Sequence, residues 1–189
     1  MGARTDTRSR MVTSAALLLR EHGVAGTSIA KVLEHSHGPR GSVGFHFPDG
    51  KTQLVSDAVR WAGGLVTRIL VKARDEGTPA DEVFAMICEL YRRQLRETDF
   101  VAGCPVGSVG QESYADPNLR EVVGEVLGEW RRELTASLVA SGHTRGAARD
   151  LADLCIASVE GAILMARIDR SSKPIDVVER RISPLLRVA

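Results

Sequence analysis

The stretch of sequence that decides the fold is residues 27–51, TSIAKVLEHSHGPRGSVGFHFPDGK. Thr27 or Ser28 provides an N-cap, because a hydroxyl oxygen there accepts a hydrogen bond from a free N–H of the first helical turn. The turn HSHG follows, and Pro39 suits the start of another helix, since its missing N–H would be unpaired there anyway. The stretch therefore predicts two short helices, ending near residues 34 and 46, joined by a four-residue turn.

Helical periodicity continues on both sides of this stretch. Upstream, apolar residues at i, i+3, i+4 and i+7 from Val12 to Leu19 predict a helix over about 6–22, which Gly23 ends. No alternating pattern of convincing length predicts a strand. We expect an all-α chain of about nine helices. Downstream, breaks rich in glycine and proline separate the other expected helices, at about 49–74, 80–98, 108–114, 117–141, 145–170 and 174–187.

Composition narrows the class of protein. Hydrophobic residues make up 43% and charged residues 26% of the 189 residues, which is typical of a globular protein. The longest uncharged runs are eleven residues, too short for a transmembrane helix. The arginines before the apolar run at 11–19 are similar to a secretory signal, but charged residues follow at once, so we expect a cytoplasmic protein.

Charge is distributed unevenly along the chain. Residues 1–51 contain seven Lys or Arg against four Asp or Glu, a net +3, whereas the remaining 138 residues contain 18 against 20, a net −2. A basic segment fits an anionic partner. Helix, turn and short helix on such a segment have the layout of a helix-turn-helix, whose second helix lies in the DNA major groove.

The residue types in the second short helix suit this interpretation. Gly41 and Gly44 keep its outer face slim, while Arg40, Ser42 and His46 offer hydrogen-bonding groups to bases or phosphates.

Lys51 adds to this interpretation from the start of the following helix. There it opposes the helix dipole, which makes sense if a phosphate docks beside it. A solvated lysine is the alternative.

Several motifs together resemble one family. These are EHG at 21–23, TSI at 27–29, GPRGS at 38–42, HFPDGK at 46–51, GCPVG at 103–107 and EGA at 160–162. They are similar to the TetR/AcrR family of bacterial transcriptional regulators, and most of all to its LmrA/YxaF-type branch. The resemblance implies a helix-turn-helix domain over 1–50 and a helical ligand-binding and dimerisation domain over 51–189.

The resemblance also implies a function. We expect a homodimeric regulator, most simply a repressor that a small hydrophobic effector releases from a pseudo-palindromic double-stranded operator. Such a protein is not an enzyme and needs no cofactor or metal. The residues expected to contact DNA are Arg4, Thr27, Ser28, Arg40, Ser42, Gly44, Phe45, His46 and Lys51, and Arg8 belongs to the same N-terminal arm as Arg4.

One departure from the family pattern keeps a second function open. Gly44 stands where the family usually has tyrosine, so a hydroxyl that contacts phosphate is lost, and glycine in a helix costs up to about 1 kcal/mol relative to alanine. Phe45 stands where histidine is frequent, and either packs on a thymine methyl group or sits half-buried. The alternative is a regulator-like ligand-binding protein with weakened or lost DNA binding.

The helix expected at 145–170 is apolar on more than one face, which predicts burial on several sides and contact with a second subunit. The residues expected at the dimer interface are Leu151, Cys155, Ser158, Val159, Ala162, Ile163, Val178 and Ile182.

The residues expected to line a ligand pocket, by resemblance, are Trp61, Leu65, Phe84, Cys88, Tyr91, Trp130 and Met165, with ordinary core packing as the alternative for each. Candidate polar anchors for the ligand are Arg92, Gln94, Glu112 and Glu160.

Three rival functions rest on weaker signals. No GxSxG, HExxH, GxGxxG or P-loop motif predicts an enzyme. His35 and His37 flank a turn without a third fixed ligand, a weak signal for a metal sensor. Cys104, in a loop of glycine and proline that looks exposed, suggests a redox switch only weakly, and three cysteines without CxxC spacing predict no disulfide framework or zinc ribbon.

Overall fold

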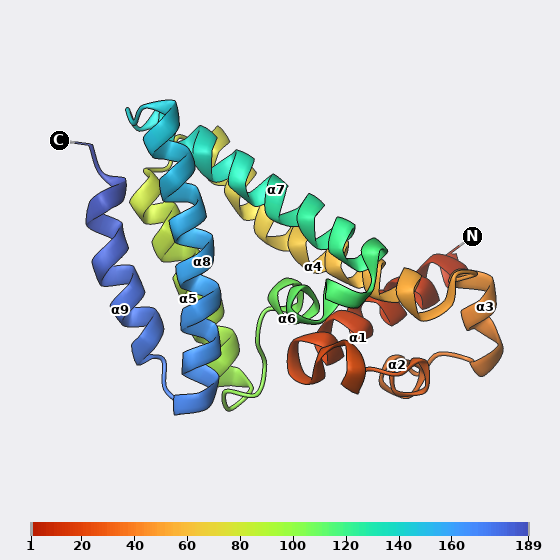
Figure 1. Cartoon of the computed structure of the whole chain (residues 1–189). Coiled ribbons are helices and arrows are strands. Elements are labelled where there is room, and N and C mark those ends of the chain that lie inside the picture. The colour runs from red at the N-terminus through yellow and green to blue at the C-terminus, as the bar shows by residue number, and fades with distance from the viewer. Residues whose placement is uncertain (1, 189) are drawn as a thin grey trace. The chain divides into compact units, whose positions relative to one another are not determined.

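A computed structural model describes residues 2–188, without the side chains of 2–6 and 40. The side chains of Arg4 and Arg40, both predicted to contact DNA, therefore lie outside the described part. Between residues 2 and 188 the chain forms nine α-helices and three short 3-10 turns, and no strand (Figure 1). The prediction of an all-α chain is confirmed. The helices are α1 (Gly2–Gly26), α2 (Ile29–Ser36), α3 (Val43–His46), α4 (Gly50–Asp75), α5 (Ala80–Glu97), α6 (Pro105–Glu112), α7 (Pro117–Ala140), α8 (Arg145–Asp169) and α9 (Lys173–Ile182).

The first helix ends where glycine predicts it. Gly23 has φ 67° and ψ −173°, a backbone conformation outside the helical region, and one further helical turn follows it up to Gly26. A residue with a Cβ is strained at such a φ, so glycine suits this position. Ser28 rather than Thr27 is the N-cap of α2, and its Oγ accepts a hydrogen bond from the N–H of Lys31 at 3.2 Å.

The helix predicted over 39–46 is present in two shorter pieces. A 3-10 turn, η1 (Arg40–Ser42), comes first, and α3 follows it as a single α-helical turn. Pro39 precedes η1 in an extended conformation, and Gly41 and Gly44 both lie in the segment. Two glycines within five residues lower the helical propensity, which explains why no longer α-helix forms here.

Packing divides the chain into two compact units. The first runs to Gly64 and adds Pro105–Val126, and the second comprises Leu65–Cys104 and the chain from Leu127 onward. Helices α4 and α7 therefore each contribute residues to both units. These compact units do not divide at residue 50, because the first half of α4 and all of α6 pack with the N-terminal helices.

Each unit has its own apolar core. In the first unit, Met11, Leu19 and Phe47 are among the side chains with almost no exposed surface, and α6 packs on α1. In the second, Phe84 and Leu138 are similarly enclosed, and α5, α8 and α9 pack against one another (Figure 1). None of the described helices is long and apolar enough to cross a membrane.

Candidate functional sites

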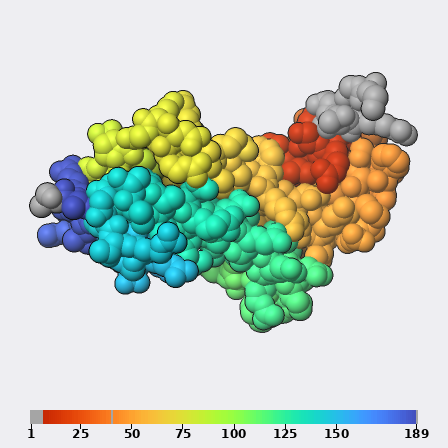
Figure 2. Space-filling view, turned by 90° about the horizontal axis from the view of Figure 1, so that it is seen from above, coloured from red at the N-terminus to blue at the C-terminus, as the bar shows by residue number. Residues whose placement is uncertain are grey.

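Helix α3 presents an open, partly aromatic surface. Phe45 is 63% exposed, so its ring is offered outward rather than half-buried. A Cβ built at Gly44 meets no atom within 4 Å, and the same holds at Gly41. In Figure 2 the segment that carries α3, in orange, lies at the molecular surface. The missing side chain at position 44 therefore leaves open space beside an exposed phenyl ring.

Two other predicted contact residues lie on the same segment. The hydroxyl of Ser42 donates to the carbonyl oxygen of Pro39 at 2.7 Å, and this hydrogen bond stabilises η1. The Ser42 hydroxyl oxygen can still accept a hydrogen bond. His46 is partly exposed, and its ring packs edge-on against that of Phe45 with centroids 5.1 Å apart. Ser42, Phe45 and His46 thus come together within one short stretch.

The start of α2 uses its two hydroxyl residues differently. Ser28 is exposed as the N-cap. Thr27 is 2% exposed, and its hydroxyl donates to the carbonyl oxygen of Gly23 at 2.7 Å. The Thr27 side chain therefore holds the end of α1 from inside, and the residue as a whole is almost fully buried, which does not fit the predicted contact with DNA.

The N-terminal part of α1 is attached to α4 through Arg8. One guanidinium nitrogen of Arg8 lies 2.7 Å from the Asp57 carboxylate, and the guanidinium carbon lies 5.4 Å from the centroid of the Phe47 ring. An ion pair and a cation–π contact on one side chain fix the direction of α1 on α4.

A polar junction joins α1 and α6 at the kink. The Glu112 carboxylate accepts hydrogen bonds from the N–H groups of Val24 and Ala25, each at 2.8 Å. A Cβ at Gly23 would lie 2.1 Å from Glu112 Oε1, closer than real atoms come. The carboxylate thus occupies the space that glycine leaves free, and it satisfies two N–H groups that the kink removes from the helix. Sequence reasoning placed Glu112 among candidate ligand anchors and missed this role.

Lys51 takes part in the same junction. Its Nζ donates to the carbonyl oxygen of Val24 at 2.6 Å, from the first turn of α4. Glu112 and Lys51 therefore hold the two sides of one peptide segment, which ties α1, α4 and α6 together. We call Gly23, Lys51 and Glu112 with the backbone of 24–25 the α1 junction.

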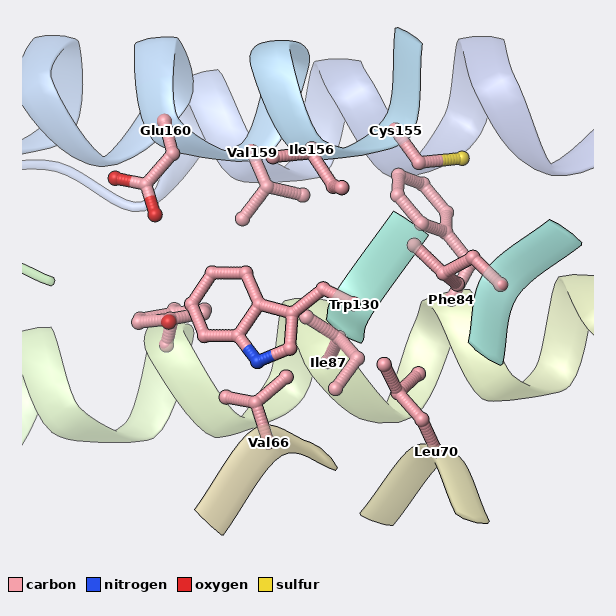
Figure 3. Close-up of a pocket in the computed structure, with 11 residues that line it drawn as sticks. Val66, Leu70, Phe84, Ile87, Trp130, Cys155, Ile156, Val159 and Glu160 are labelled. Carbon is pink, nitrogen blue, oxygen red and sulfur yellow. The ribbon is translucent and has the colours of Figure 1, made fainter. Parts of the chain in front are cut away.

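The second unit contains a small, almost wholly apolar cavity (Figure 3). Its volume is about 30 Å³, room for a water molecule but far below the several hundred Å³ of a typical ligand pocket. Ligand entry therefore requires wall side chains to move. The cavity is lined by Val66, Leu70, Phe84, Ile87, Tyr91, Trp130, Leu134, Cys155, Ile156, Val159 and Glu160.

Polar groups gather at one end of this cavity. The Tyr91 hydroxyl donates to Cys104 Sγ at 3.4 Å, and the Cys104 thiol is also hydrogen-bonded to Glu160. Burial raises the pKa of Glu160, and the thiol hydrogen bond opposes the rise only in part. Burial also raises the pKa of Tyr91, so its hydroxyl stays protonated.

The predicted ligand residues separate into two groups. Phe84, Tyr91 and Trp130 do line the cavity, together with the candidate anchor Glu160. The other four predicted residues, Trp61, Leu65, Cys88 and Met165, are not among the lining residues, and Met165 points outward with 55% of its surface exposed. Of the other candidate anchors, Arg92 is bound by the carboxylates of Glu89, Asp176 and Glu179, which fastens α9 to α5.

The residues predicted at the dimer interface differ in their exposure within the single chain. Cys155, Val159, Ala162, Ile163 and Ile182 are buried inside the second unit of the single chain. Leu151, Ser158 and Val178 are partly exposed. Because α8 is apolar on more than one face, its sequence does not reveal which face turns inward, and the predicted set contains both buried and partly exposed residues. The apolar residues that α8 exposes are Leu154, Leu164, Met165 and Ile168, followed by Val177 on α9 and Leu185 beyond it.

The signals for the rival functions have structural explanations. His35 Nδ1 lies 3.0 Å from the Ser14 hydroxyl, and His37 ends α2 in a left-handed conformation. Within the described residues no group of three His, Cys, Asp or Glu side chains is placed to hold a metal ion. Cys104 is buried, contrary to the exposed loop expected from its glycine and proline neighbours.

With this geometry established, comparison with known proteins decides the family. A family model described as "Transcriptional regulator LmrA/YxaF-like, C-terminal domain" matches residues 79–181. An uncharacterized HTH-type transcriptional regulator of Mycobacterium tuberculosis, Rv0196, is 39% identical over 186 residues, covering 95% of this chain and 93% of the relative. The chain belongs to the TetR family.

Two further comparisons agree with TetR-family membership. The HTH-type transcriptional regulator LmrA of Bacillus subtilis is 29% identical over 96% of this chain and 97% of its own. The crystal structure of a TetR transcriptional regulator from Chloroflexus aurantiacus matches with a TM-score of 0.78 and 27% identity, covering 97% of this chain and 96% of that one. This TetR-family protein is thus a DNA-binding transcriptional regulator, not an enzyme.

Proposed function

We propose that the protein is a repressor that binds a pseudo-palindromic operator as a homodimer and leaves it when a small hydrophobic effector occupies the cavity of the second unit. The observation that carries the proposal is the outward-facing α3, with Phe45 exposed beside the open space at Gly44. Repression needs only occupancy of the operator, because a bound dimer excludes other proteins from the same DNA.

The DNA contacts fall into two kinds. Arg40, Ser42 and His46 are proposed to reach base edges and phosphates, and Phe45 to pack on a thymine methyl group. Arg4 and Ser28 are proposed to meet the DNA backbone, whereas the buried Thr27 is proposed to support them by holding the end of α1.

Lys51 is proposed to contact a phosphate while it holds the α1 junction. An ammonium group has three N–H donors, and the bond to Val24 uses one. The remaining donors are free to point at an anion near the start of α4.

The dimer is proposed to form through the exposed stripe on α8, from Leu154 to Ile168, continued by Val177 and Leu185. Gly161 is exposed in the same stripe, and its small size permits close approach of a second helix. A two-fold dimer sets the two α3 helices at a fixed separation, so the operator half-sites lie about one helical turn, ~34–36 Å, or a multiple of it apart.

Binding of the effector is proposed to weaken binding of the operator, and the reverse. A ligand that enlarges the cavity favours a conformation of the dimer that no longer matches the half-site spacing. DNA must then weaken ligand binding by the same factor, because the coupling is reciprocal.

The experiment that tests this function is selection of genomic fragments by the purified protein at about physiological salt, where non-specific phosphate binding is suppressed. We expect a few fragments that share an inverted repeat. Phe45→Ala should weaken binding to the selected site about tenfold. The matched control is Tyr114→Ala, which removes another exposed aromatic ring of the first unit and should change nothing.

The same fragments test the role of Lys51. If Lys51 contacts a phosphate, Lys51→Ala lowers the salt dependence of log K by about one. An unchanged slope would leave Lys51 as a residue of the α1 junction only. No enrichment over an Arg40→Ala, Lys51→Ala double variant would support the second candidate function, ligand binding without DNA binding, which the absent side chain at position 44 favours.

The dimer surface is tested separately. Ile168→Asp places a charge at the most exposed apolar position of α8 and should convert the dimer to monomer in sedimentation velocity. Met86→Asp, at an exposed apolar position of α5, is the control and should stay dimeric. A dimer in both variants would exclude the proposed stripe.

A further inference from the structure

The cavity of the second unit has one feature that a purely hydrophobic site does not need. Figure 3 shows the Glu160 carboxylate turned from α8 toward the space beside Trp130. The other ten lining residues include no Lys, Arg or His, so the wall offers no positive charge to this group. An acid is therefore held in an apolar cavity without a basic partner in its wall.

The groups that face Glu160 supply neither a positive charge nor a strong hydrogen-bond donor to stabilise an ionised carboxylate. They are the Cys104 thiol, which donates only weakly, and the Tyr91 phenol, whose hydroxyl donates to that same thiol. The lining residues from α4 and α7 carry no titratable group, and the only other titratable group in the wall is the Cys155 thiol. Burial raises the pKa of Glu160, which means that its ionised form is poorly solvated in the empty cavity.

A positive charge would complete this site. We propose that the effector cavity takes organic cations, with the charge beside Glu160 and an apolar or aromatic body against the rest of the wall. The inference rests on the proposed function, because it names the ligand class of that same cavity. It assigns the role of ligand counter-ion to Glu160.

The rest of the wall suits such a ligand. Phe84, Tyr91 and Trp130 all contribute rings to the cavity, and aromatic faces attract cations, most strongly when water is excluded. An anionic ligand would meet Glu160 with like charge and find no basic side chain in the wall. A neutral ligand would leave the carboxylate unpaired, or bind with it protonated.

The small volume of the cavity adds a constraint on the ligand. At about 30 Å³ it admits no organic cation without movement of the wall. The ion pair thus contributes part of the free energy that opens the cavity, which couples the charge of the ligand to the conformation of the unit.

The test compares two probes of the same shape, benzyltrimethylammonium and its neutral carbon analogue neopentylbenzene, by titration of the tryptophan fluorescence of the full-length dimer. The quaternary cation does not titrate, so any pH dependence reports on the protein. We expect the ratio of cation affinity to neutral affinity to rise between pH 5 and pH 8, as Glu160 loses its proton. In Glu160→Gln the ratio should be about tenfold lower at pH 8 and flat with pH.

Controls separate this inference from the proposed function. Glu121→Gln removes an exposed carboxylate of α7 and should leave the ratio as in the parent protein. Binding of neopentylbenzene by Glu160→Gln shows that the variant retains a folded cavity. A ratio that is independent of pH and unaffected by Glu160→Gln would overturn the cation assignment while leaving the cavity a ligand site. If neither probe binds, both the cation assignment and the proposal that the cavity is a ligand site are overturned.

Discussion

The α1 junction and the cavity of the second unit are organised in opposite ways. At the junction, carboxylate and ammonium groups bind main-chain atoms of Val24 and Ala25 at 2.6–2.8 Å, and Gly23 leaves no space for a further atom. At the cavity, apolar side chains enclose a small free volume and a single acid. The comparison shows where geometry is fixed and where it is free to change: the junction of the first unit depends on close fit, whereas the cavity of the second unit has room to be reshaped.

Gly23→Ala is the substitution that should disturb the junction most. The new Cβ would overlap Glu112 Oε1, and φ at this position lies in the region that costs a residue with a Cβ about 1–2 kcal/mol. Together with loss of the Glu112 hydrogen bonds, we expect a decrease of about 3 kcal/mol in the free energy of unfolding, measured by urea denaturation.

Gly44→Ala is the matched control for that substitution. The space around position 44 is open and its φ is not left-handed, so alanine should raise stability, by up to about 1 kcal/mol. Equal losses at both glycines would contradict the view that the junction is the tightly fitted site.

Glu112→Ala should have a smaller effect than Gly23→Ala. It leaves the N–H groups of Val24 and Ala25 without their acceptor. Because the site is only partly buried, water can take over some of this hydrogen bonding. We therefore expect a decrease of about 1 kcal/mol in the free energy of unfolding. In the double variant with Gly23→Ala the two losses should add to less than their sum, because removal of Glu112 also removes the steric overlap. Strict additivity in urea denaturation would show that the two residues do not interact.

The smallest effect is expected at the cavity, and it depends on pH. The pKa of Glu160 is raised in the folded protein above its ordinary value of 4.5, so folding favours the protonated form. The stability of the parent protein then falls as pH rises through the folded-state pKa, whereas Glu160→Gln has no such loss. The Tm of the variant relative to the parent should increase from pH 4.5 to pH 8. A constant difference would mean that Glu160 is not desolvated.

Much of the fold could be predicted from sequence because its signals are local. Gly23 and the N-cap Ser28 act through their own backbone or hydroxyl group, and the helices that they delimit are where the sequence predicts them. The division of 39–46 into η1 and α3 depends on the sum of weak propensities, which is harder to read from sequence.

The sites were less predictable because they depend on which face of a helix turns inward. On α8, Cys155 and Val159 face the cavity, whereas Leu154 and Ile168 face outward, and both sets are apolar. Glu112 has no sequence signal for its role, since its partners are main-chain atoms of a distant segment. Glu160 was a candidate anchor through the ligand pocket that the family resemblance implies, and its sequence context does not show that it lines the cavity.

The contact between Gly23 and Glu112 also has an evolutionary consequence. A residue with a Cβ at position 23 would overlap the Glu112 carboxylate, so Glu112 would have to shift and give up its hydrogen bond to the Val24 amide. A substitution at position 23 is tolerated better once position 112 has changed, so the two positions should covary. The order in which such changes occur is then biased: a shorter side chain at 112 should come first.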